Sequence, residues 1–98
     1  MPERIPPWGR EYFLEQLDIW IALEKPDIDL LLVVTAWVLG VGLNPYLGAH
    51  REPGFPSLWC AVISGTHHGD HVVVCSYEII EPSRELRCKG FGTLSWPV

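Results

Sequence analysis

Hydrophobic and polar residues alternate along the second half of the chain, and this pattern predicts three antiparallel β-strands. The strands are expected at residues 57–64, 71–80 and 84–93, which are rich in apolar and β-branched side chains. Residues 65–70 and 81–83 separate them and contain Gly, Asp, Pro and Ser, which tolerate the backbone angles of turns. The second half is therefore predicted to form a three-stranded antiparallel sheet.

Symmetric pairing about the two turns would place Cys60 near Cys75, and Cys75 near Cys88, in one row across the sheet. We assign this face to the core, because its other members are mostly apolar: Leu58, Val62, Val73, Tyr77, Ile79 and Leu86. The opposite face is apolar at one end and charged at the other, and we expect it to be a surface or to contact a partner. Its members are Trp59, Ala61, Ile63, Val72, Val74, Ser76, Glu78, Glu85, Arg87 and Lys89.

The first half of the chain predicts two helices. Residues 10–25 carry apolar side chains at three- and four-residue spacing, and Pro26 ends that helix. Either Asp27 or Asp29 can cap a second helix, which would end near Leu43. Many of its residues are β-branched, so a buried strand is the alternative, but the capping carboxylates, the length and the following glycines favour a helix.

The second helix is apolar almost all round, which predicts a buried core helix rather than a membrane span. Its most apolar run, residues 30–43, is shorter than the roughly 20 residues that cross a bilayer. Residues 44–56 predict an irregular connector, and Arg4-Ile5 could add a short edge strand. The expected fold is a single α+β domain over residues 1–98, with two N-terminal helices on one face of an antiparallel sheet of three or four strands.

Composition narrows the classes of function. The net charge of −5 argues against a protein whose whole surface binds nucleic acid. Three cysteines, and a start without an apolar secretory core, favour the reducing cytoplasm. Five tryptophans in 98 residues predict that some remain partly exposed and form a sticky surface.

Two groups of residues could hold a metal ion, although we expect no cofactor. The turn containing His67, His68, Asp70 and His71 offers ligands suited to Zn²⁺ or Ni²⁺, but neighbouring side chains of a turn diverge, so a solvated polar turn is the main expectation. The cysteine row could be a thiolate site or a cross-strand disulfide, yet free cysteines usually pack as small hydrophobes in a core.

A basic concentration on the last strand is the candidate phosphate-binding site. Arg84, Arg87 and Lys89 could hold a nucleic-acid backbone together with His50 and Arg51. Trp59 or Phe91 could stack a base. Glutamates at positions 78, 81 and 85 could instead pair with these cations, which would leave a solvated charged face.

The order of elements resembles the RelE/ParE superfamily of small toxins from bacterial toxin–antitoxin pairs, over about residues 10–92. The resemblance rests on Leu43-Asn44-Pro45 after the helical hairpin, on the segment 48–54, on Leu58-Trp59 opening a strand, and on residues 72–77 ending in Tyr77. It implies a cytoplasmic protein that an antitoxin holds inactive. Its target would be messenger RNA on the ribosome or, in the ParE branch, DNA gyrase.

The resemblance also implies roles for individual residues. Arg51 matches the basic position before the first long strand, and Arg87 or Lys89 matches those on the last, with His50 as a second contributor to catalysis. Lys89, Arg84 and Trp59 would then bind substrate. The chain departs from many active members at its end, residues 92–98, where a basic tail with His or Tyr is missing, so both an active ribonuclease and a catalytically degenerate member stay open.

A different class of function is a non-catalytic protein–protein interaction domain, which would bind a partner or its own copy as a homodimer through a Trp-rich surface.

Overall fold

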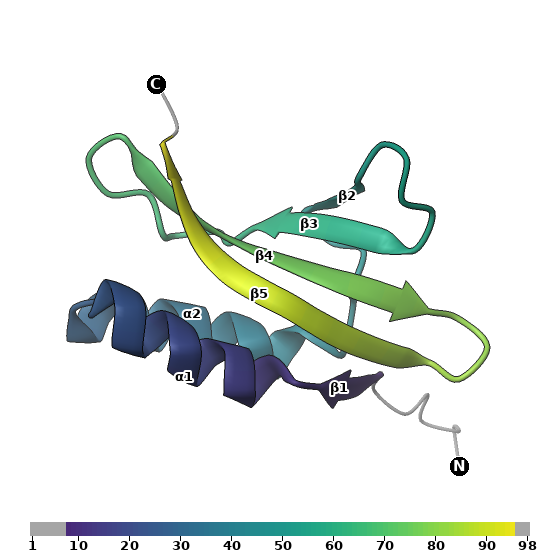
Figure 1. Cartoon of the computed structure of the whole chain (residues 1–98). Helices are drawn as coiled ribbons and strands as arrows, with labels where there is room; N and C mark the ends of the chain where they lie inside the picture. Colours follow the sequence, from purple (N-terminus) through teal and green to yellow (C-terminus); the bar gives the residue numbers. More distant parts are fainter. Residues whose placement is uncertain (1–7, 96–98) are drawn as a thin grey trace, which may run out of the picture.

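The computed structural model describes residues 8–95, in which two helices cover one face of a five-stranded sheet (Figure 1). The elements follow the order β1 (Gly9–Glu11), α1 (Phe13–Glu24), α2 (Ile28–Val41), β2 (Ala49–Arg51), β3 (Leu58–Val62), β4 (His71–Ile80) and β5 (Glu85–Ser95). Across the sheet the order of strands is β1-β5-β4-β3-β2, so the long strands β4 and β5 lie in its middle. The face that packs on the helices is called the inner face below, and the opposite one the outer face.

The expectation of an antiparallel sheet of three or four strands was wrong, because the sheet is mixed and has five strands. β1 pairs with β5 in parallel, with Gly9 opposite Glu85, while all other pairs are antiparallel. β1 uses residues that were expected to begin the first helix, and β2 lies in the segment expected to be irregular. The strand expected at Arg4-Ile5 lies outside the described residues.

Both predicted helices form, with shorter bounds. α1 starts only at Phe13, because Tyr12 has a φ of 67° and turns the chain out of β1. α2 begins after Asp27, whose carboxylate accepts a hydrogen bond of 2.8 Å from the backbone N–H of Leu30. Of the two aspartates that could cap this helix, Asp27 is therefore the cap.

The core lies between the helices and the inner face. α1 contributes Phe13, Leu17 and Trp20, and α2 contributes a stripe of buried side chains at Val34, Val38 and Val41. The helix α2 is not buried all round as expected, because it lies on one side of the sheet and no other element of residues 8–95 covers its outward side. Its outward positions are exposed by 60% or more, at Ile28, Leu32 and Leu39. No helix among residues 8–95 is both long and apolar enough to cross a membrane.

The pairing of β3 with β4 differs by one residue from symmetric pairing. Cys60 lies opposite Ser76, and Cys75 lies opposite Ala61. A slip of one residue turns every side chain of a strand to the other face, so the predicted faces of β3 were wrong. Cys60 lies on the outer face with Val72 and Val74, whereas Trp59, Ala61 and Ile63 pack into the helix-facing core.

Cys75 and Cys88 do share the inner face, and their Sγ atoms are 3.6 Å apart as free thiols. Tyr77 pairs with Cys88 in the register that starts at the turn, and beyond a bulge between Ser76 and Tyr77 Cys75 pairs with Phe91, so the two cysteines are diagonal neighbours rather than directly opposite. Both are buried, and burial raises the pKa of the Cys75 thiol far above its ordinary value. They pack as core residues, as expected for structural cysteines.

Candidate functional site

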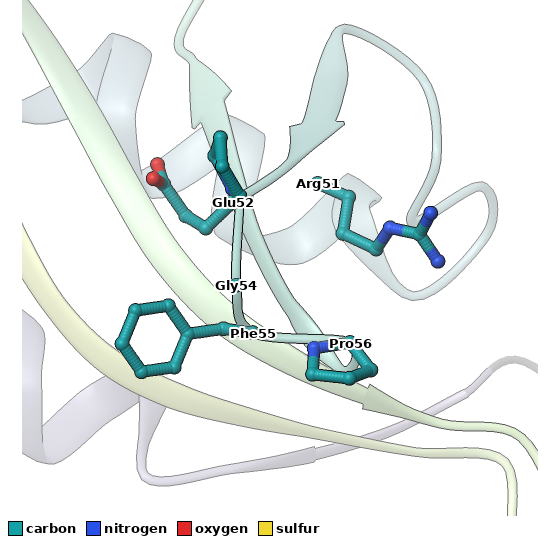
Figure 2. Close-up of a pocket in the computed structure, with 6 residues that line it drawn as sticks. Arg51, Glu52, Gly54, Phe55 and Pro56 are labelled. Carbon is teal, nitrogen blue, oxygen red and sulfur yellow. The ribbon is translucent and has the colours of Figure 1, made fainter.

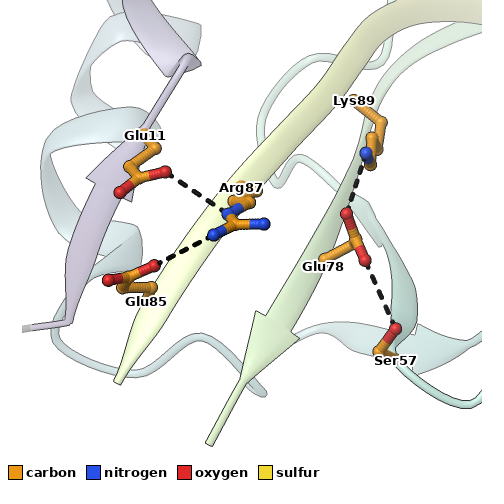
Figure 3. Close-up of polar contacts among 6 residues, drawn as sticks. All are labelled: Glu11, Ser57, Glu78, Glu85, Arg87 and Lys89. Carbon is orange, nitrogen blue, oxygen red and sulfur yellow. Dashed lines mark hydrogen bonds and ion pairs between the residues drawn. The ribbon is translucent and has the colours of Figure 1, made fainter. Parts of the chain in front are cut away.

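The charged half of the outer face contains paired rather than free cations. Arg87 of β5 contacts Glu11 of β1 at 3.3 Å and Glu85 at 3.5 Å, and the Lys89 ammonium lies 2.8 Å from Glu78 of β4 (Figure 3). The hydrogen bond from Lys89 lowers the pKa of the Glu78 carboxyl. Each of these two cations therefore has a carboxylate beside it, which weakens the positive field available to a phosphate.

An open, largely apolar groove lies next to this pair. It has a volume of about 350 Å³ and is lined by Phe55, Pro56, Ser57, Leu58, Ser76, Glu78 and Lys89. A second hollow of about 420 Å³ is formed by residues 51–56, and it shares Phe55 and Pro56 with the groove (Figure 2). The Phe55 side chain is 61% exposed, so its ring is available to a planar ligand.

The structure separates the three residues expected to share a catalytic role. His50 pairs with Cys60 on the outer face, whereas the next residue, Arg51, is turned to the other side of strand β2. Arg87 is on the outer face too, but β3 and β4 lie between its strand and β2. Three strand spacings of about 4.8 Å separate strands β2 and β5 by roughly 14 Å, and His50 and Arg87 are further apart still because Arg87 is displaced along β5 from the row of His50.

The other residues that were expected to bind substrate do not lie together either. Lys89 lines the groove, but the Arg84 guanidinium lies 4.6 Å from the centre of the Trp8 ring, beside the turn that leads into β5. Trp59 faces inward, and its ring contacts Tyr46 at 5.0 Å between centroids. Of the expected residues, His50, Lys89 and Arg87 share the outer face, and Lys89 alone lines the groove.

Two side chains of the histidine-rich turn contact other residues of the same turn. His68 bonds through Nδ1 to the Thr66 carbonyl at 2.7 Å, and His71 contacts the Asp70 carboxylate at 2.8 Å. The rings of His68 and His71 stack with 5.8 Å between their centroids. Within residues 8–95, three metal-ligating groups do not converge at this turn.

Three metal-ligating groups do converge at another place, which the sequence analysis did not predict. The ligand atoms of His50, Glu52 and Cys60 all lie within 4.8 Å of one another. Burial, and then the nearby Glu52 carboxylate, raise the pKa of the Cys60 thiol, while a hydrogen bond with Ser76 opposes this. The sequence signal was present in the His-x-Glu spacing, but it required the correct pairing of β2 with β3.

A further surface is formed by aliphatic side chains on the side of the helices that faces away from the sheet. A groove of about 140 Å³ runs between α1 and α2 beside Leu14 and Leu39. The exposed aliphatic residues of the helices and the following loop, termed the aliphatic surface, are Leu14, Ile19, Leu23, Ile28, Leu32, Leu39, Leu43 and Leu47. The expected Trp-rich surface is not found in residues 8–95, where each tryptophan is buried or half-buried.

Comparison with known proteins gives a structural match but no sequence match. The sequence matches no family model and no curated protein. The structure is similar to that of the E. coli toxin RelE, a variant with two arginines replaced by alanine, in its free state. The two share 11% sequence identity and superpose with a TM-score of 0.59 over 89% of this chain and 83% of RelE. The chain therefore has a RelE-like fold.

Proposed function

We propose that this chain is the toxin-like component of a bacterial toxin–antitoxin pair and acts in the cytoplasm. The fold supports this proposal, since the similar structure is a toxin and the likeness covers most of both chains. The three free thiols fit a reducing compartment. At 11% identity the likeness concerns the fold alone, so the proposal needs an observation from this chain's own surface.

The aliphatic surface is that observation. Leu14 and Leu39 are exposed by 68% and 65% and border the same groove between the helices. Covering each large aliphatic side chain is worth about 1.5–3 kcal/mol, and extended apolar patches mark sites of protein association. We assign this surface to the antitoxin, whose segment would lie along α1 and α2 with its own apolar side chains inward.

Cleavage of messenger RNA is a second candidate, and the outer-face groove favours it. Phe55 can stack a base and Lys89 can contact a phosphate, and the His50 imidazole on the same face is a group that can act as a general acid or base. Carboxylates beside Arg87 and Lys89 oppose the binding of a polyanion. We therefore propose a ribonuclease of reduced activity, with His50 and Lys89 contributing more than Arg51.

The first experiment is tightly induced expression in a bacterial host, alone and together with the protein encoded by the adjacent gene. The proposal expects growth arrest that co-expression relieves. The double variant Leu32→Glu, Leu39→Glu should still arrest growth but escape the relief, because the antitoxin would no longer bind. Normal growth of cells containing folded protein would overturn the toxin proposal and favour a non-catalytic interaction domain.

Measurement of intact messenger RNA in the same cells separates the candidate targets. Loss of mRNA that His50→Ala and Lys89→Gln reduce, and that the control Lys25→Gln does not, would support cleavage. Lys25 is a suitable control because it lies after α1, at the end of the helix and away from the outer-face groove. Arrest with intact mRNA would contradict cleavage and direct attention to gyrase.

A further inference from the structure

The group formed by His50, Glu52 and Cys60 is held in place by the backbone at the edge of the sheet. His50 lies directly opposite Cys60 in the antiparallel pair β2–β3. The backbone N–H of Glu52 donates a hydrogen bond of 2.9 Å to the Leu58 carbonyl, which extends this pairing beyond the end of β2. Residues two apart on a strand face the same side, so His50 and Glu52 both lie on the side of Cys60.

The side chains themselves agree with this placement. Figure 2 shows Glu52 pointing to one side of the loop and Arg51 to the other. The imidazole, carboxylate and thiol ligand atoms lie within 4.8 Å of one another. Three donors of different chemistry thus converge on one point of the outer face, and Arg51 is kept away from it.

We propose that His50, Glu52 and Cys60 form a binding site for Zn²⁺, with the fourth position open to water or to a ligand. Thiolate, imidazole and carboxylate are the three side-chain ligands that Zn²⁺ takes in proteins, and a site with three of them keeps one position free. This site is distinct from the histidine-rich turn. It shares His50 with the proposed ribonuclease site, but metal binding by the purified chain tests it separately from the toxin function.

The geometry permits closure around the ion with small rotations. Zinc–ligand bonds of about 2.0–2.3 Å in a tetrahedron place neighbouring ligand atoms about 3.3–3.6 Å apart. The present separations of up to 4.8 Å therefore have to shrink by up to about 1.2–1.5 Å. His50 is exposed and Glu52 half-buried, so both can adjust their side-chain angles, while Cys60 is fixed within the sheet opposite Ser76.

Titration of the purified full-length chain with Co²⁺, a spectroscopic substitute for Zn²⁺, tests the site. We expect one equivalent of Co²⁺ to give the visible bands of a tetrahedral ion and the near-ultraviolet charge-transfer band of a cobalt–thiolate bond, and Zn²⁺ to abolish both. Cys60→Ser should remove the charge-transfer band. His50→Ala and Glu52→Gln should each weaken binding roughly tenfold or more.

Two control variants keep the proposal falsifiable. The triple variant His67→Ala, His68→Ala, His71→Ala should leave both bands unchanged, and Cys88→Ala should keep the charge-transfer band because that thiol lies in the core. Far-ultraviolet circular dichroism checks that each variant is folded. Absence of the thiolate band, its persistence in folded Cys60→Ser, or its loss in the triple variant would overturn the proposal.

Discussion

The hydroxyl of Tyr77 donates a hydrogen bond of 2.5 Å to the backbone carbonyl of Pro45, 32 residues earlier in the chain. This bond ties the centre of β4 to the loop that follows α2. Tyr77 is fully buried, and burial raises the pKa of its phenol well above the ordinary value, so the hydroxyl remains a neutral donor. The tyrosine that ends the resembling segment thus belongs to the core and not to the outer face.

Tyr77→Phe should lower the free energy of unfolding by about 1–3 kcal/mol, because the Pro45 carbonyl would lose its partner in a buried place. Urea unfolding at neutral pH measures this change. Tyr12→Phe is the matched control, since Tyr12 is 55% exposed and its variant should keep the wild-type stability. Equal stabilities of the two variants would contradict the role given to the bond.

Two leucines on the same helix should differ sharply in their contribution to stability. Leu17 of α1 is 5% exposed and packs in the core, whereas Leu14 is 68% exposed. Leu17→Ala should cost about 2–5 kcal/mol through lost burial and a cavity. Leu14→Ala should stay within about 0.5 kcal/mol of the wild type in the isolated chain. Thermal or urea unfolding of the two variants compares them, and a large loss for Leu14→Ala would show that its side chain is already covered.

The N-terminus of α2 should depend on Asp27 more than on Asp29. Asp27→Ala removes the acceptor for the Leu30 N–H and should cost about 0.5–2 kcal/mol. Asp29→Ala removes only a favourable charge in the first turn, worth about 0.3–1 kcal/mol. Urea unfolding in low and high salt separates the two, because only the charge effect should fade with salt. The reverse order of the two losses would contradict Asp27 as the cap.

The pair of Glu78 and Lys89 should give a stability difference that depends on pH. The hydrogen bond from Lys89 lowers the pKa of Glu78 in the folded chain, so its contribution is present above the unfolded pKa of about 4.3 and is lost as the pH falls through the folded pKa. Lys89→Gln should cost about 0.2–1 kcal/mol at pH 7, since the pair is partly screened by solvent.

Urea midpoints at pH 7 and at strongly acidic pH measure this difference, which should be smaller under acid conditions. Lys25→Gln, a surface control outside the pair, should change neither midpoint by a comparable amount. A difference for Lys89→Gln that persists when Glu78 is protonated would assign the effect to packing of the lysine stem and not to charge.

Replacing either of two glycines at the end of α2 by alanine should have opposite effects on stability. A methyl group at Gly40 would meet no atom within 4 Å, so Gly40→Ala should stabilise the helix by about 0.5–1 kcal/mol. At Gly42 the added carbon would lie 3.1 Å from the Trp8 carbonyl, and the backbone N–H of Trp8 donates to the Gly42 carbonyl. Gly42→Ala should therefore loosen this contact and lower the melting temperature, and an increase would contradict the close approach.

The parts of the fold that depend on local signals could be predicted from the sequence. Pro26 and Asp27 mark the boundary between the helices, and alternation marks the long strands. The pairing of β3 with β4 could not be read, because the connection between them is not symmetric. Its geometry is set by Thr66, whose hydroxyl donates to the Ile63 carbonyl at 2.6 Å and accepts from the Val73 N–H at 3.0 Å.

That one-residue difference also decided what could be predicted of the sites. Glu78, Arg87 and Lys89 were placed on the correct face, since the alternation within β4 and β5 near their turn holds. Cys60 was assigned to the core, which hid its closeness to His50 and Glu52. The exposed leucines could not be foreseen either, because an apolar helix surface reads the same in a sequence whether the chain itself or a partner covers it.

The parallel pairing of β1 with β5 has a consequence for the order of folding. Gly9–Glu11 pairs with residues 85–87, so the first strand cannot pair until a partner more than 70 residues later in the sequence is in place. Until then the helices can form, but the edge of β5 that pairs with β1 stays unpaired. Contacts between distant parts of a sequence slow folding. Completion of this sheet is therefore expected as a late step of folding, which brings together the two ends of the described residues.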